Sequence, residues 1–187
     1  LYVAIRAFDD EPDQIERRLT RRDQFQGDFV GISLDSYYDR LTAYSFIVNA
    51  AGVKNDERIT NDSDFDESWD PVWYVKVSTD EWGWAAEMKI PYSQLRFAKK
   101  DKHTWGIQVI RYLFRKEEYS IWQMIPREAS GWVSLYGALN GIENIEPKKE
   151  VELIPYTMGK FVTDAKEEGN PFATGTEYGY NLGLDGK

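Results

Sequence analysis

Hydrophobic and polar residues alternate along most of the chain, which predicts β-strands and little helix. Leu1, Val3, Ile5 and Ala7 share one face of a first strand, which ends in the acidic turn 9–12. Further strands are predicted where β-branched and aromatic residues gather between polar turns: 29–34, 42–53, 72–78, 83–90, 104–114, 119–124 and 133–139. Short strands at this spacing are typical of an all-β, antiparallel β-sandwich or barrel.

Two segments favour helical turns instead. Residues 13–19 follow Pro12, carry acids near their start and place Ile15 and Leu19 four positions apart, which predicts one short helix. Residues 91–97 begin with a proline and predict a single helical turn.

A change of pattern near residue 142 predicts a domain boundary. Residues 1–142 form the expected sandwich, 143–149 have the composition of a polar linker, and 150–187 form a second unit. Apolar residues alternate with small or polar ones along 177–185, as in a strand of an outer-membrane β-barrel. A soluble edge hairpin has the same alternation. Because the chain starts directly in a strand, we expect it to be an N-terminally truncated part of a longer protein.

Composition narrows the function. A hydrophobic fraction of 42% with 15% aromatic residues indicates a folded protein, and a net charge of -9 disfavours nucleic acid as a partner. Cysteine is absent, which excludes disulfides and thiolate sites. The single histidine, His103, excludes multi-histidine metal sites and is predicted to lie in a polar turn. No apolar run reaches the roughly twenty residues that a membrane helix needs.

Acidic residues form two clusters. The first comprises Asp9, Asp10, Glu11 and Asp13, with Asp28 and Asp35 near the next strand; the second spans 62–70. Crowded carboxylates of this kind supply the oxygen ligands of calcium, or are simply solvated turns. A catalytic carboxylate pair for glycoside hydrolysis is not singled out by any motif among the 32 acids.

Tryptophan is frequent, and aromatic rings stack on the flat C–H faces of sugars. The seven positions are 69, 73, 82, 84, 105, 122 and 132. Trp84 shares a strand face with Ala86 and Met88, which predicts a place in the core. Trp132 follows a polar, glycine-containing loop, so we expect it to be partly exposed.

Four phrases resemble a known family. They are LYVAIRAFDDEPDQI, DFVGISLDSYYDRLTAYSFIVNAAGVKND, WDPVWYVKVSTDEWGWAAEMKIPYSQLRF and WGIQVIRY. They are similar to family 9 carbohydrate-binding modules, in the form that precedes an outer-membrane barrel of unknown function in Bacteroidetes-type bacteria. The resemblance covers roughly Leu1 to Ile142, and YGYNLGLDGK resembles the opening of that barrel. It implies a β-sandwich, no enzymatic activity, structural calcium, and a place in the Gram-negative cell envelope, in the outer membrane or periplasm.

The resemblance also implies site residues. Two aromatic side chains sandwich a terminal sugar in the family; Trp132 falls near the later one and Phe25 near the earlier one. Asn49 matches a sugar-contacting Asn, although Ile47 stands where the family has Arg. We expect Trp132 at the mouth of a shallow cleft, with Asn49 as its polar companion, and count Trp122 as a further aromatic candidate. The calcium ligands correspond to Asp9 and Asp28.

These observations predict a non-catalytic carbohydrate-binding module of an outer-membrane protein, with terminal sugars of a polysaccharide as its ligand. Two other functions fit the same sequence. One is a structural or protein-interaction domain that caps the barrel, and the other is an accessory domain of a glycoside hydrolase.

Overall fold

The computed structural model describes residues 1–24, 26–147, 153–163, 169–170 and 175–186. The chain divides into two compact units, Leu1–Lys148 and Lys149–Lys187. Helical structure within the described residues consists of 3₁₀ turns of three residues each: η1 (Pro12–Gln14), η2 (Tyr92–Gln94), η3 (Phe114–Lys116) and η4 (Val133–Leu135). No helix in these ranges has the length and apolarity needed to cross a membrane.

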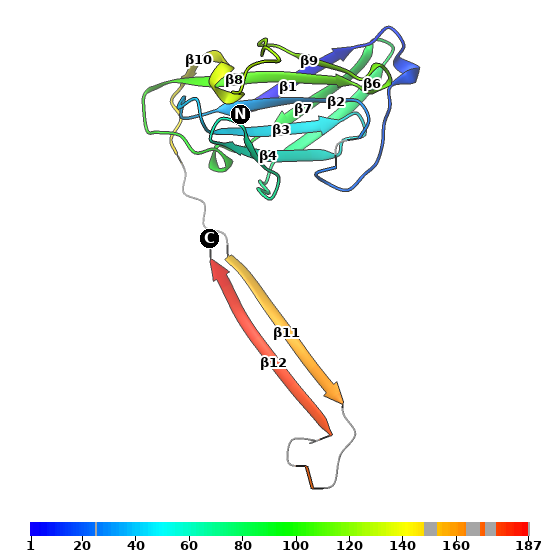
Figure 1. Cartoon of the computed structure of the whole chain (residues 1–187), viewed down its shortest axis with the longest axis vertical. Helices are drawn as coiled ribbons and strands as arrows, with labels where there is room; N and C mark the ends of the chain where they lie inside the picture. The colour runs from blue at the N-terminus through cyan, green and yellow to red at the C-terminus, as the bar shows by residue number, and fades with distance from the viewer. Residues whose placement is uncertain (25, 148–152, 164–168, 171–174, 187) are drawn as a thin grey trace. The chain divides into compact units, whose positions relative to one another are not determined.

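The first unit consists of two antiparallel sheets that pack face to face (Figure 1). The smaller sheet has the order β1-β7-β6, formed by β1 (Tyr2–Phe8), β7 (Gly83–Lys89) and β6 (Tyr74–Asp80). The larger sheet has seven strands in the order β10-β8-β2-β3-β4-β5, with β9 also paired to β8. They are β2 (Phe29–Asp35), β3 (Ala43–Asn49), β4 (Lys54–Thr60), β5 (Asp64–Asp66), β8 (Lys102–Leu113), β9 (Glu118–Ile121) and β10 (Gly137–Glu143). The predicted antiparallel β-sandwich is confirmed.

The apolar core lies between the inner faces of the two sheets. The largest side chains there are Trp73, Trp84 and Trp105, none of them more than 2% exposed. The core position predicted for Trp84 is therefore confirmed. Removing one such ring costs about 3–5 kcal/mol, because the cavity only partly collapses.

The helix expected over residues 13–19 is wrong. Only η1 forms, and Leu19 is 85% exposed. The backbone N–H of Glu16 donates to Asp28 Oδ2 at 2.7 Å, and the N–H of Asp28 donates to the Glu16 carbonyl at 3.0 Å. These long-range bonds hold the chain beside the start of β2, so helical spacing is overridden by tertiary contacts.

Other boundaries also move. The segment 42–53 ends as a strand at Asn49, and a turn containing Gly52, with φ of +86°, leads into β4. The strand β4 was not anticipated because its sequence, KNDERIT, is almost wholly polar. Residues 133–139 begin as η4 and become strand only at Gly137.

His103 is not a turn residue. It lies in β8, is 5% exposed, and meets the ring of Phe97 edge-on at 5.3 Å between centroids. The polar run with Lys99, Lys100 and Lys102 led to the prediction of a turn, although β8 begins at Lys102. The helical turn predicted within 91–97 is present as η2.

The second unit is a hairpin of β11 (Leu153–Thr163) and β12 (Thr176–Gly186). Phe161 pairs with Tyr178, and their rings are 5.1 Å apart. Tyr180, Leu182 and Leu184 continue the same face and are 62–87% exposed. The alternation in the sequence therefore produces one apolar hairpin face. The linker over residues 143–149 and the assignment of residues 150–187 to an outer-membrane barrel stay predictions.

Candidate functional site

The outer face of the larger sheet carries a row of polar side chains. The strand register places Glu57 opposite Ser45, Ser45 opposite Ser33, and Ser33 opposite Gln108. Paired residues point to the same side of a sheet, so these side chains cross β4, β3, β2 and β8 as one continuous line. We call these four residues the polar row.

Hydrogen bonds already hold most of the polar row in place. The Ser33 and Ser45 hydroxyls are hydrogen-bonded to each other, with their Oγ atoms 2.9 Å apart, and the Tyr136 hydroxyl donates to Ser33 Oγ at 2.8 Å. Gln108 Nε2 donates to the Gln123 carbonyl at 2.7 Å, and Gln108 Oε1 accepts the Gln123 N–H at 2.8 Å. Ser33, Ser45 and Gln108 are 0–3% exposed and bonded within the protein, so they support the surface around Glu57 and do not themselves offer groups to a ligand.

Glu57 is the charged member of the polar row and is partly exposed. Burial raises its pKa above the ordinary value, a hydrogen bond from Ser45 opposes this, and the negative charge of Glu67 raises it further. Carboxylates accept strong hydrogen bonds from hydroxyl groups. Glu57 is therefore suited to accept bonds from a hydroxyl-rich ligand.

Asn55 lies next to the polar row, two residues before Glu57 on β4. Its side chain is 4% exposed, and neither its Oδ1 nor its Nδ2 has a hydrogen-bond partner. Buried polar groups are nearly always paired, and leaving one unpaired costs about 1–3 kcal/mol. A bridging water beside this buried amide would supply the bonds that the protein groups do not make.

Trp132 lies on one side of the polar row. It is partly buried against a small cluster of Ala43, Ile59, Val133 and Tyr136. Its indole N–H is hydrogen-bonded to the Tyr136 hydroxyl. Its loop is held because Asp62 Oδ1 accepts the backbone N–H groups of Trp132 at 3.0 Å and Ser134 at 2.7 Å.

A second ring extends the Trp132 side of the site. Phe65, on β5, is 50% exposed, and its centroid lies 6.3 Å from that of Trp132. Register explains the contact, because Phe65 pairs with Ile59 and so shares its outer face. The partial exposure expected for Trp132 agrees with this position.

Aromatic residues also lie on the other side of the polar row. Tyr119, Tyr112 and Phe29 occupy one line across β9, β8 and β2, with ring centroids 5.1–6.2 Å apart. Tyr119 is 48% exposed. Partial burial, and then the charge of Glu57, raises the pKa of Tyr119 to about 12. The outer face thus combines fixed hydroxyls, one carboxylate and flanking rings.

The comparisons with known proteins concern this same sandwich. No family model matches the sequence, and no curated protein matches it. One solved structure does match: a family 9 carbohydrate-binding module from Caldicellulosiruptor kristjanssonii in complex with cellotriose. The TM-score is 0.50 at 18% identity, over 78% of this chain and 74% of the module. The fold is similar to that of a family 9 carbohydrate-binding module. At this identity, the likeness shows the architecture alone.

Asn49 does not accompany Trp132 on this module-like sandwich. Its Nδ2 donates to the carbonyls of Arg18 and Gln26, and its Oδ1 accepts the N–H groups of Ala51 and Val53. The side chain is 5% exposed. Because its amide is fully occupied by backbone groups, Asn49 organises two loops and has no free group for a sugar.

Its distance from Trp132 leads to the same correction. Asn49 is six residues along β3 from Ala43, against which Trp132 packs, or about 20 Å at the usual strand rise. The other proposed aromatic wall, Phe25, lies outside the described residues. Trp122 is 60% exposed, but its ring lies against Gly137, where an added Cβ would come within 2.4 Å of it.

Asp9 and Asp28 do not fit a calcium site in their present arrangement. Asp9 Oδ1 and Oδ2 accept hydrogen bonds from the guanidinium of Arg115 at 2.6 and 2.8 Å, and Arg111 lies 3.7 Å away. The hydrogen bond from Arg115 is the main reason that the pKa of Asp9 is lowered. A fixed guanidinium thus stands where the predicted ion would neutralise Asp9.

Asp28 is the other expected calcium ligand. Its Oδ2 accepts the N–H of Glu16, while Oδ1 is buried without a hydrogen-bond partner. Burial raises the pKa of Asp28, and the charge of Asp9 acts in the same direction. Among the described residues, no group of three or more acidic or histidine side chains is arranged to hold a metal.

The polar row itself was missed by the sequence interpretation. Its members lie at positions 33, 45, 57 and 108, on strands brought together only by sheet register. One local signal was present: in KNDERIT, Asn55, Glu57 and Ile59 alternate with Asp56 and Arg58, as in a strand.

Proposed function

We propose that the outer face of the larger sheet binds carbohydrate, as a non-catalytic module that takes the terminal sugars of a polysaccharide. The observation that carries this is the partly exposed Glu57 carboxylate with accessible rings on both sides, Trp132 and Phe65 on one side and Tyr119 on the other. Sugar hydroxyls need such an acceptor, and sugar C–H faces need such rings. The family 9 structural neighbour was solved with cellotriose, which supports neutral glucan oligosaccharides as the first ligands to try.

The proposal includes a cell-envelope setting. We infer that the second unit belongs to an outer-membrane barrel, in the outer membrane or periplasm of a Gram-negative bacterium. Support comes from the apolar face of the β11–β12 hairpin, formed by Phe161, Tyr178, Tyr180, Leu182 and Leu184. Partitioning of the full chain into detergent micelles, compared with a Leu182→Asp/Leu184→Asp variant, tests this part. Equal partitioning of the two proteins would contradict it.

Calorimetric titration with cellotriose and related neutral oligosaccharides tests sugar binding. Glu57→Gln keeps the shape of the side chain but removes the charged acceptor, so we expect its affinity to fall about tenfold. Glu81→Gln, in the exposed turn between β6 and β7, is the matched control and is expected to bind like the wild type. A folded protein that binds no oligosaccharide would refute the proposal, and release of reducing ends would show a hydrolase instead.

A second candidate is an interaction domain that caps a barrel without binding sugar. It is favoured by the full occupation of the Asn49 amide and by Ile47, which lies in an apolar cluster with Phe29 and Ile110. Failure of every oligosaccharide, together with co-purification of a barrel fragment with the first unit, would support this candidate.

A further inference from the structure

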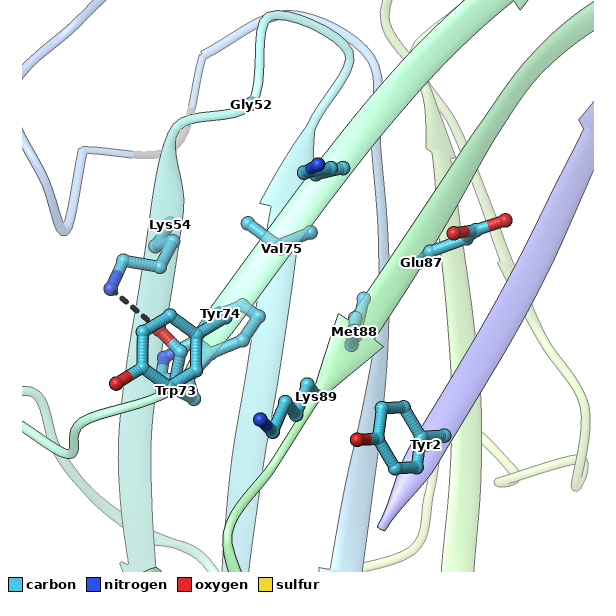
Figure 2. A pocket seen from close by; sticks show the side chains of 10 residues that line it. Tyr2, Gly52, Lys54, Trp73, Tyr74, Val75, Glu87, Met88 and Lys89 are labelled. Atoms are coloured by element: carbon cyan, nitrogen blue, oxygen red, sulfur yellow. Dashed lines mark hydrogen bonds between the residues drawn. The ribbon is translucent and has the colours of Figure 1, made fainter.

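A pocket of about 500 Å³ lies in the first unit, on the side of the smaller sheet (Figure 2). Met88 and Trp73 form its buried base, being 2% and 1% exposed. Trp73 is fixed because its indole N–H donates to Asp56 Oδ1 at 2.7 Å. Small-molecule sites usually occupy roughly 300–1,000 Å³, so this pocket is of the right size to hold a ligand.

Two exposed tyrosines flank a lysine beside this pocket. Lys89 pairs with Tyr2 of β1 on one side and with Tyr74 of β6 on the other. Figure 2 shows Lys89 between the two rings, and its Nζ lies 5.6 Å from the Tyr74 centroid. Tyr2 is 78% exposed and Tyr74 58%. Their strands are two sheet spacings apart, about 10 Å, which is the span of a disaccharide.

Lysines gather beside this pocket, although the chain has a net charge of -9. Lys54, Lys76 and Lys89 line the pocket, and Glu87 is the one acid among its lining residues. Glu87 pairs with Lys76 across the strands and offsets its charge. Ion pairs within 4.0 Å involve other lysines of the described residues, at positions 99, 102 and 160. Neither Lys54 nor Lys89 takes part in such an ion pair among the described residues.

Lys54 is the more enclosed of these two cations. Its ammonium donates to the Trp73 carbonyl at 3.1 Å, as Figure 2 shows. Burial, and then the charge of Arg22, lowers the pKa of Lys54, while the carboxylates of Asp56, Asp70 and Asp23 act in the opposite direction. Lys54 thus already has acids as neighbours, and Lys89 is the cation that lies between the two tyrosines.

From these features we infer a second binding site, specific for sugar chains that carry carboxylate groups. The rings of Tyr2 and Tyr74 stack on sugar faces, while Lys89 binds a carboxylate. The site is on the smaller sheet, whereas the polar row is on the outer face of the larger sheet. The two sites therefore differ in location and in ligand, and each can fail without the other.

The test is calorimetric titration of the full 187-residue chain with trigalacturonic acid and with its methyl ester. The ester has the same sugar faces but no charge. We expect the acid to bind at least about tenfold more tightly than the ester, and less tightly at high salt. Lys89→Gln is expected to weaken acid binding about tenfold and to leave ester binding unchanged.

Lys102→Gln is the matched control, because Lys102 is an exposed lysine of the larger sheet paired with Glu143. It should bind the acid as the wild type does. Trp132→Ala should also keep acid binding, which separates this site from the proposed glucan site. Equal affinity for acid and ester, or an unchanged affinity in Lys89→Gln, would overturn the inference. Inorganic phosphate binding as tightly as the trisaccharide would overturn the sugar specificity.

Discussion

Replacement of Trp132 by Ala separates the ligand-binding role of this ring from its packing role. The ring is partly buried, contacts Phe65 and Tyr136, and gives one hydrogen bond to the Tyr136 hydroxyl. A fully buried Trp costs about 3–5 kcal/mol when truncated, so a ring with one exposed side should cost less. Including the lost hydrogen bond, we expect a destabilisation of roughly 2 kcal/mol.

The expected effect on binding is larger than the effect on the fold. A ring that stacks on a ligand behaves as a binding hot spot, and its removal costs roughly 2 kcal/mol, or about thirtyfold in Kd. Chemical denaturation measures the first quantity and calorimetry with cellotriose the second. Both are determined at a temperature where the variant is folded.

Trp82→Ala serves as the matched control. Trp82 is 63% exposed and lies in the turn between β6 and β7, away from the polar row. Both its stability and its glucan affinity should stay within about 0.5 kcal/mol of the wild type. A Trp132→Ala variant that loses 3–5 kcal/mol of stability but retains its glucan affinity would refute the reasoning, because Trp132 would then be a core residue alone.

Four further predictions test the electrostatics and the core. Burial raises the pKa of Glu57, so the ionised Glu57 carboxylate destabilises the fold at a pH above its folded-state pKa. Glu57→Gln should therefore raise the unfolding midpoint at pH 7 but not at pH 3. Arg115→Met should cost about 2 kcal/mol of unfolding free energy, because it leaves Asp9 unpaired. A chelator should leave the thermal unfolding midpoint of the wild type unchanged. A midpoint lowered by the chelator would instead support calcium at Asp9. Arg115 lowers the pKa of Asp9 in the folded protein. The stability that this pair supplies should therefore be lost as the pH falls from the ordinary Asp pKa through the folded-state pKa of Asp9. Urea titrations at a series of pH values measure this loss. Trp84→Ala should lose about 3–5 kcal/mol in the same assay.

Local pattern was enough to predict the class of fold. Alternation over residues 1–7 and 83–90 assigned Ile5 and Trp84 to the core, because a strand has a period of two and only one face is apolar. The same rule failed for β4, whose seven residues include one aliphatic side chain, Ile59. That strand lies in the larger sheet between β3 and β5, which supply its hydrogen bonds whatever its polarity.

The site depended on contacts between distant parts of the chain. Asp9 was expected to bind calcium, but its carboxylate pairs with Arg115, 106 residues away, and no local motif encodes that pairing. Asn49 was expected to contact sugar because of the family resemblance, but its amide is hydrogen-bonded to the backbone of the neighbouring loops. Composition and periodicity thus determined that this chain is a β-sandwich rich in aromatic residues. Sheet register decided which polar groups meet, because a side chain's neighbours across a sheet are set by strand pairing and not by sequence distance.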